Sequence, residues 1–177
     1  SDKGILVPDN GSLFFAGGLI RDLSYSPLLP KKITDVIKYK DHTVYLDDKH
    51  VFSNAWAGKI QIDHHMPGAL MVAGGEDFHF LVSNGSNLVY LNSAGDKLWE
   101  GALENIREIK YDPAKKRFII AAANKVAELT ASGAINILYE GKNIRTAQAL
   151  SNSDKIAVGT AAGYVVLPDT QLITRVP

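Results

Sequence analysis

The sequence lacks cysteine and has no excess of charge of either sign. With no cysteine among its 177 residues, disulfides, thiolate metal sites and a cysteine nucleophile are excluded. The 19 lysines and arginines balance 19 aspartates and glutamates, so the basic surplus usual in nucleic-acid-binding proteins is missing. The longest apolar stretch, residues 12–20, is far shorter than the roughly 20 residues of a membrane-spanning helix. We therefore expect no nucleic-acid partner and no membrane span in this chain.

Short apolar segments separated by turn residues dominate the chain. Hydrophobic residues make up 46% of the sequence, but no stretch keeps a helical apolar period over three turns. Eighteen segments, each of about four to seven residues, lie between residues 4 and 176, and this is the usual length of a β-strand. Asn84-Gly85 and Ser132-Gly133 are among the separators, and such pairs supply the positive φ of tight hairpins. The pattern predicts an all-β domain.

A repeat organises these segments. Asn105-Ile106-Arg107 recurs 38 residues later as Asn143-Ile144-Arg145. The same offset aligns a series of apolar residues and two turn glycines: Phe80, Phe118 and Ile156; Val82, Ile120 and Val158; Leu91, Leu129 and Leu167; Gly95 and Gly133. A period near 40 residues that holds about four strands is typical of a β-propeller blade. Because neighbouring blades cover both faces of each sheet, this architecture also explains strands that are apolar on both sides.

The repeat divides the chain into predicted blades. They span residues of about 33–66, 67–104, 105–142 and 143–177, with residues 1–32 as part of another blade. This gives a single β-propeller domain of four-stranded antiparallel blades, about four to five in this chain. The repeat loses phase before residue 67, which favours part of a larger propeller over a closed four-bladed ring. Such a piece is expected to self-associate or to pack against further propeller blades through the sheets at its two ends.

Two segments resemble the repeats of known propeller families. Residues 88–99, Leu-Val-Tyr-Leu-Asn-Ser-Ala-Gly-Asp-Lys-Leu-Trp, resemble the quinoprotein-type repeat, in which a V-Y-A-L-D strand precedes G-K-x-x-W. Residues 155–164 resemble the W-V-G-T-x-x-G-L repeat of two-component-regulator propellers, which form ligand-sensing domains of bacterial membrane receptors. Ile137 and Ile156 stand where these repeats would place tryptophan. The resemblance covers about residues 78–167, and it implies a type of repeat without implying any functional residue.

Arg107 and Arg145 are the first candidates for a ligand-binding site. They lie at equivalent places just after predicted blade boundaries, and equivalent positions of a propeller form a ring at one end of its channel. Two guanidinium groups there would hold an anionic ligand such as a carboxylate or sulfate. The alternative is a repeated salt bridge to an acidic neighbour, for example Glu104 or Asp112.

Trp56 and His79 are the other candidate ligand-binding residues. Trp56 lies in the loop-like segment 54–58, where an exposed indole could stack on a sugar ring, with packing between blades as the alternative. His79 lies between two phenylalanines. It could act as a catalytic group because histidine titrates near neutral pH, or it could hydrogen-bond a neighbouring blade. Further aromatic candidates are Trp99, Tyr45, Tyr90 and Tyr164.

Asp63, His64 and His65 form the cluster that most resembles a metal site. Histidine and carboxylate suit zinc or iron. Adjacent residues of a strand point to opposite faces, so the two histidines could share a metal only if they lie in a loop. We expect a polar segment between blades, with no bound metal and no cofactor.

Two functions remain open at this stage. The first is a non-catalytic propeller that binds a small ligand, such as a carbohydrate or an anion, or a protein. The sensor part of an extracytoplasmic receptor is one form of it, and it implies a periplasmic or extracellular location. The second is a carbohydrate-active hydrolase or lyase that uses His64, His65, His79 and the arginines. The chain has no G-x-S-x-G, H-E-x-x-H or P-loop motif, which favours the non-catalytic function. Clustering of the histidines and arginines at one channel mouth would favour the enzyme.

Overall fold

The computed structural model is an all-β fold over the residues that it describes. These residues are 5–9, 12–16, 35–39, 42–46, 50–55 and 60–174, apart from Phe78, Ser93, Ala131, Asn152 and Gln171. Within these ranges there is no helix long and apolar enough to cross a membrane. The strands are β1 (Ile5–Asp9), β2 (Ser12–Ala16), β3 (Asp35–Tyr39), β4 (His42–Leu46), β5 (His50–Ala55), β6 (Ile60–His65), β7 (Met71–Gly74), β8 (Phe80–Ser83), β9 (Asn87–Leu91), β10 (Lys97–Ala102), β11 (Ile106–Asp112), β12 (Arg117–Ala122), β13 (Lys125–Thr130), β14 (Ile135–Glu140), β15 (Ile144–Ala149), β16 (Ile156–Thr160), β17 (Gly163–Leu167) and β18 (Leu172–Thr174).

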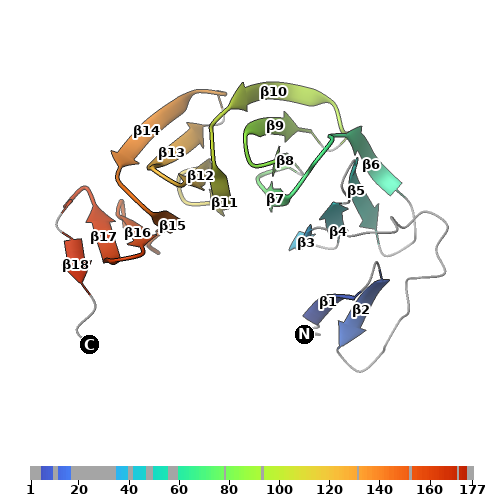
Figure 1. Ribbon diagram of the computed structural model, residues 1–177. Helices are drawn as coiled ribbons and strands as arrows, with labels where there is room; N and C mark the ends of the chain where they lie inside the picture. The colour runs from blue at the N-terminus through green and yellow to red at the C-terminus, as the bar shows by residue number, and fades with distance from the viewer. Residues whose placement is uncertain are drawn as a thin grey trace.

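The described strands form four sheets of four and one hairpin. The sheets are β3–β6, β7–β10, β11–β14 and β15–β18, in each of which consecutive strands pair antiparallel, and β1 pairs with β2. Figure 1 shows the four sheets side by side along an arc, with the first strand of each on the inner side. Successive inner strands contact one another along the chain, β3 with β7, β7 with β11, and β11 with β15. The predicted all-β class and the predicted propeller architecture are confirmed.

The two middle sheets, β7–β10 and β11–β14, bury side chains on both faces. In β12, Phe118 and Ile120 pack in a cluster with the preceding sheet, whereas Ile119 and Ala121 pack in a cluster with the following sheet. Alternation of side chains along a strand produces this division. A sheet with two neighbours can therefore bury consecutive residues of a strand, and β12 is buried at five consecutive residues from Phe118 to Ala122.

Three apolar clusters lie between successive sheets. One cluster joins β3–β6 to β7–β10, the second joins β7–β10 to β11–β14, and the third joins β11–β14 to β15–β18. Leu91, Leu129 and Leu167, which the repeat aligns, are 0%, 0% and 7% exposed. Their burial at equivalent positions confirms the register deduced from the 38-residue offset.

Asparagine sets the path from one sheet to the next. Asn105 and Asn143 precede β11 and β15 with φ of 58° and 55°, in the left-handed region that asparagine tolerates better than most residues. The carbonyl oxygen of each accepts a hydrogen bond from the residue that follows the second strand of the new sheet, Ala123 N–H at 3.0 Å and Ala161 N–H at 3.1 Å. The repeated Asn-Ile-Arg tripeptide thus marks the same crossover in two successive sheets.

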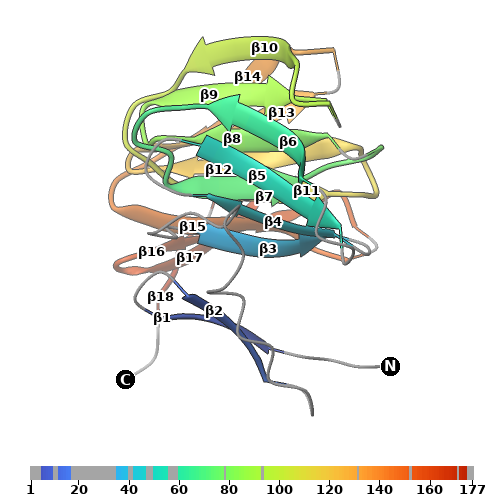
Figure 2. The ribbon, with the colours of Figure 1, turned by 90° about the vertical axis from the view of Figure 1, so that its right-hand side faces the viewer.

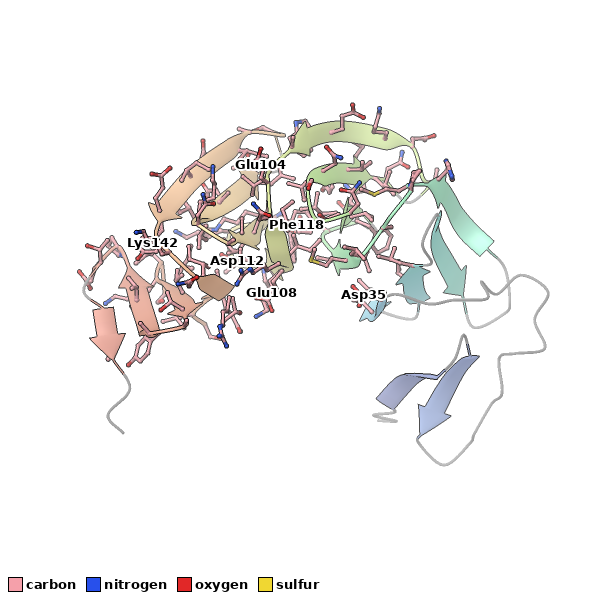
Figure 3. All side chains as sticks on the ribbon, viewed as in Figure 1. Asp35, Glu104, Glu108, Asp112, Phe118 and Lys142 are labelled. Carbon is pink, nitrogen blue, oxygen red and sulfur yellow. The ribbon has the colours of Figure 1, made fainter. Side chains whose placement is uncertain are left out.

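Carboxylates on inner strands tie neighbouring sheets together. Asp35 of β3 accepts a hydrogen bond from the backbone N–H of Val72 in the next sheet at 3.0 Å. Glu108 of β11 accepts one from the N–H of Ala147 in β15 at 3.4 Å. Both carboxylates lie on the inner side of the arc in Figure 3. Each contact joins two adjacent inner strands, so it reinforces the stacking produced by the apolar clusters.

The outward face of the last sheet has no neighbouring four-stranded sheet among the described residues. Tyr164 of β17 and Ile173 of β18 are 44% and 43% exposed. Figure 2 shows the β1–β2 hairpin apart from the stack of four sheets, and β1 has only β2 as a hydrogen-bonded neighbour among the described strands. The expected association through the end sheets stays a prediction.

Candidate functional site

A cavity of about 430 Å³ opens between the second and third four-stranded sheets. Its lining comes from the β7–β8, β11–β12 and β13–β14 turns and from the strand segments beside them. All of these turns lie at the same end of the two sheets, because consecutive strands run antiparallel. The volume falls within the range of small-molecule sites, and the position between two rigid sheets fixes the walls on both sides.

Four aromatic side chains form the wall of this cavity. They are Tyr90 and Trp99 from the second sheet and Tyr111 and Phe118 from the third. The ring centroid of Phe118 lies 5.6 Å from that of Tyr90 and 5.0 Å from that of Tyr111. Figure 3 shows Phe118 between the two sheets. These spacings are those of favourable aromatic pairs, so the wall is a connected aromatic surface shared by both sheets.

Glycine on each sheet makes room for an aromatic ring of the other. A Cβ at Gly75, in the second sheet, would lie 2.8 Å from Cζ of Phe118. A Cβ at Gly133, in the third sheet, would lie 3.0 Å from Cδ1 of Trp99. Gly133 also has a φ of 84°, which side-chain-bearing residues rarely adopt. The two glycines therefore set how closely the sheets approach at the cavity.

The polar rim of the cavity is mostly engaged in pairs. The Lys116 ammonium lies 3.2 Å from the Glu76 carboxylate across the two sheets. The Ser132 hydroxyl is hydrogen-bonded to the Thr130 hydroxyl at 2.8 Å. Among the described lining residues, Asp77 is the carboxylate for which no hydrogen-bond or ion-pair partner is found. The rim thus carries two carboxylates against one ammonium.

His79 lies in this cavity and pairs with Tyr90. Its Nδ1 is 3.2 Å from the Tyr90 hydroxyl, and the two rings meet edge to face at 5.5 Å between centroids. One 38-residue repeat later, the same two positions hold Arg117 and Glu128, which form an ion pair. The hydrogen bond between His79 and Tyr90 joins two residues of the second blade, and no bond from the His79 side chain to a neighbouring blade is found among the described residues.

The Arg117 guanidinium has two carboxylate partners. Its Nε lies 3.0 Å from Asp112, its Nη1 lies 2.5 Å from Glu128, and all three side chains are at least 85% buried. Burial by itself would raise the pKa of Glu128, but hydrogen bonds from Arg117 and Asn136 and the charge of Arg117 outweigh it and hold that pKa below 4.5. The ion pair therefore stabilises the third sheet with Glu128 ionised.

This pKa shift predicts acid sensitivity that depends on Glu128. Because the folded-state pKa is lowered, the stabilisation is present above the unfolded-state pKa and is lost as the pH falls through the folded-state value. Urea unfolding measured from pH 7 down to pH 3 should show stability decreasing below about pH 4.5. The decrease should be smaller in Glu128→Gln, which is already less stable at pH 7. Parallel pH profiles of the two proteins would contradict this assignment.

Arg107 and Arg145 lie at the opposite end of their sheets. Each follows the first residue of its inner strand, where the pairing with the next strand is irregular, and both are exposed. Arg107 donates from Nη1 to the carbonyl oxygen of Ile144 at 2.9 Å, whereas Asp112 pairs with Arg117. Arg145 has no hydrogen-bond or ion-pair partner on its side chain among the described residues. Anion binding by this pair stays a prediction.

Of the remaining candidate site residues, only some lie in the part of the chain that the structure describes. Trp56 lies outside the described residues. Asp63, His64 and His65 lie in β6 and not in a loop, and the side chains of the first two are outside the described set. The expectations of a sugar platform at Trp56 and of no metal at the cluster therefore stay predictions.

Sequence reasoning weighed Tyr90 and Trp99 but missed the turn residues of the cavity. The sequence holds a signal for the aromatic wall, though not for the turns: Trp99-Glu100-Gly101 recurs as Tyr139-Glu140-Gly141. A Cβ at either glycine would lie within 2.6 Å of the ring two residues before it. Both rings pack in the cluster that joins their sheet to the next. The two motifs are 40 residues apart, so a fixed offset of 38 hides them.

Comparison with known proteins identifies the fold class. Searches against protein-family models and curated protein sequences give no match. Solved structures do match. BamB from Moraxella catarrhalis has a TM-score of 0.68 at 13% identity over 93% of this chain. Streptogramin B lyase has a TM-score of 0.71 at 13% identity over 99%. The extracellular domain of the one component system BT4673 from B. thetaiotaomicron has a TM-score of 0.65 at 14% identity over 98%. The protein is therefore a β-propeller.

These similar structures are longer than the chain. The chain spans 53% of BamB, 70% of streptogramin B lyase and 27% of the BT4673 chain. At identities of 13–14%, the likeness establishes the propeller fold alone.

Proposed function

We propose that the protein is a non-catalytic propeller module that binds a ligand in the cavity between its second and third four-stranded sheets. The observation that carries this proposal is the connected aromatic wall, built from both sheets and opening at a rim with an unpaired carboxylate. Apolar concave walls with a few polar groups are typical of ligand sites. A ligand there would contact two blades at once, so its binding would depend on their relative position.

The distribution of candidate catalytic groups supports binding over catalysis. His79 lies at the cavity, whereas Arg107 lies at the other end of the strands. The two ends are joined by β11, which has 7 residues and spans about 20 Å, too far for one reacting substrate atom to contact both. A carbohydrate-active lyase or hydrolase, the alternative, would need these groups together. The likeness to streptogramin B lyase concerns the fold and does not supply that clustering.

A sensor role outside the cytoplasm is the form of this function that we favour. The likeness to an extracellular domain of a one component system and the resemblance of residues 155–164 to regulator-type repeats both support it. In such a receptor, occupancy of a site between two blades would change the packing of their shared core. A protein partner at the rim would act through the same surface.

Fluorescence of Trp99 tests whether the cavity binds a ligand. The chain has two tryptophans, so Trp56→Phe leaves Trp99, in the cavity wall, as the only indole. Titration with a library of amines, sugars, carboxylates and aromatic compounds should give a saturable change in its emission for at least one class. Ser132→Phe, which fills the rim, should abolish that change. Ser153→Phe, an exposed turn serine in the last sheet, is the matched control and should not.

Two results of the Trp99 titrations would contradict the proposed function. If no compound class changes the Trp99 emission, or if Ser132→Phe and Ser153→Phe have equal effects, the cavity is a packing gap between blades and the proposed function fails.

A further inference from the structure

The charge of the ligand is the subject of this inference, which deepens the proposed function and rests on it. We propose that its ligand carries an organic cation, a protonated amine or a guanidinium group on a flat or apolar body. The cation would sit against the aromatic wall and pair with Asp77. A free small molecule and an arginine or lysine side chain of a polypeptide are two sources of this same chemistry.

The aromatic wall is the first reason for this assignment. The face of an aromatic ring is electron-rich and attracts cations within about 6 Å of its centroid. Phe118 contacts both Tyr90 and Tyr111, and Trp99 completes the lining. Four rings around one space make a surface that favours a cation over an anion.

The state of the polar rim is the second reason. Glu76 is paired with Lys116, His79 with Tyr90, and Ser132 with Thr130. A sugar requires several hydrogen-bonding groups that are ready to accept and donate, and these pairings engage most of those present. Asp77 is the exception among the described charged residues of the lining, and a single available carboxylate is what a single cation requires.

The backbone conformation at Asp77 and Lys116 allows each charge to be removed by substitution with asparagine. Asp77 has a φ of 49° and Lys116 a φ of 52°, and asparagine is tolerated in this left-handed region. Asp77→Asn and Lys116→Asn therefore each remove one charge from the rim without forcing a new backbone. Both side chains are exposed, so neither change is expected to unfold the protein.

Matched probes separate charge from shape. Benzamidine and benzamide have the same flat body, but only benzamidine is cationic at pH 7. A hexapeptide with a central arginine and the same peptide with citrulline form the corresponding polypeptide pair. Binding is measured by Trp99 emission in the Trp56→Phe protein, which avoids any assumption about activity.

We expect the cationic member of at least one pair to bind more tightly than its neutral match. Asp77→Asn should weaken that cation's binding by about tenfold and leave the neutral match unchanged. Lys116→Asn should strengthen it by up to about fivefold. Preference for benzamidine identifies a small-molecule cation, and preference for the arginine peptide alone identifies a polypeptide.

Two results would overturn the proposal in different ways. If charged and neutral probes bind equally, or if Asp77→Asn has no effect on the cation, charge selection is wrong while ligand binding in the cavity stands. If neither the matched probes nor the wider library changes Trp99 emission, both the proposed function and this inference fail.

Discussion

Leu129→Ala is expected to lower the free energy of unfolding by about 2–5 kcal/mol, the range for a large-to-small change in a rigid core. Leu129 is fully buried. It lies in β13 opposite Phe118 of β12 and Ile135 of β14, within the cluster that joins the second and third sheets. Removal of its side chain leaves a void between two sheets that are fixed by their neighbours, so little collapse can offset the loss.

Urea or guanidinium unfolding measures this change. Leu150→Ala is the matched control, because Leu150 is 39% exposed and its truncation is expected to cost no more than about 0.5 kcal/mol. A cost below about 1 kcal/mol at Leu129 would mean that the second and third sheets do not share a rigid core. The register of the repeat would then be wrong as well.

Trp99→Ala is expected to cost about 3 kcal/mol, at the lower end of the range for a large aromatic side chain because this indole is partly exposed. The indole crosses from β10 onto Gly133 of the next sheet, so its loss removes apolar contact between two blades. Trp99→Phe should retain part of that contact and cost less. Equal stabilities of the alanine variant and the wild type, measured by the same unfolding experiment, would show that the indole does not join the blades.

A double-mutant cycle isolates the contact of Trp99 with Gly133. Gly133→Ala introduces two costs: strain at a φ of 84° and a close approach of Cβ to the indole, at 3.0 Å. In the Trp99→Ala background the approach disappears, so only the conformational cost of about 1–2 kcal/mol should remain. A Gly133→Ala effect that is the same in both backgrounds would rule out coupling between the two residues.

The fold could be predicted because the 38-residue repeat places equivalent residues at equivalent positions of successive sheets. Leu91, Leu129 and Leu167 stand at one offset and are all buried, since each occupies the third strand of a sheet that stacks in the same way. Runs such as β12, buried at five consecutive positions, could arise only where a sheet has neighbours on both faces. Composition and periodicity were sufficient for this part.

The cavity could not be predicted in the same way, because several of its lining residues depart from the repeat. His79 and Tyr90 stand where the next sheet has Arg117 and Glu128, so a position that holds an ion pair in one blade faces a cavity in another. Asp77 lies in a turn, where sequence patterns specify conformation but not which groups meet across two sheets. Such contacts depend on the stacking distance, which no pattern in the chain records.

The two arginines show the opposite situation, and anion binding by them stays a prediction. Arg107 and Arg145 were singled out because they repeat, but repetition here marks a shared crossover between sheets. The Arg107 guanidinium donates to the backbone of Ile144 in the next blade, a partner without a distinctive side chain and therefore without a signal in the sequence. Neither of the proposed salt-bridge partners, Glu104 and Asp112, is in contact with it as an ion pair among the described residues.

Hydrogen–deuterium exchange with and without the tightest-binding compound from the Trp99 titrations tests the central claim most directly. If the ligand occupies the cavity between the second and third four-stranded sheets, amides of residues 75–77 and 132–134, which belong to different sheets, should be protected together. Protection confined to residues 105–107 and 143–145, at the opposite end of the sheets, would contradict this account and place the ligand at the arginines.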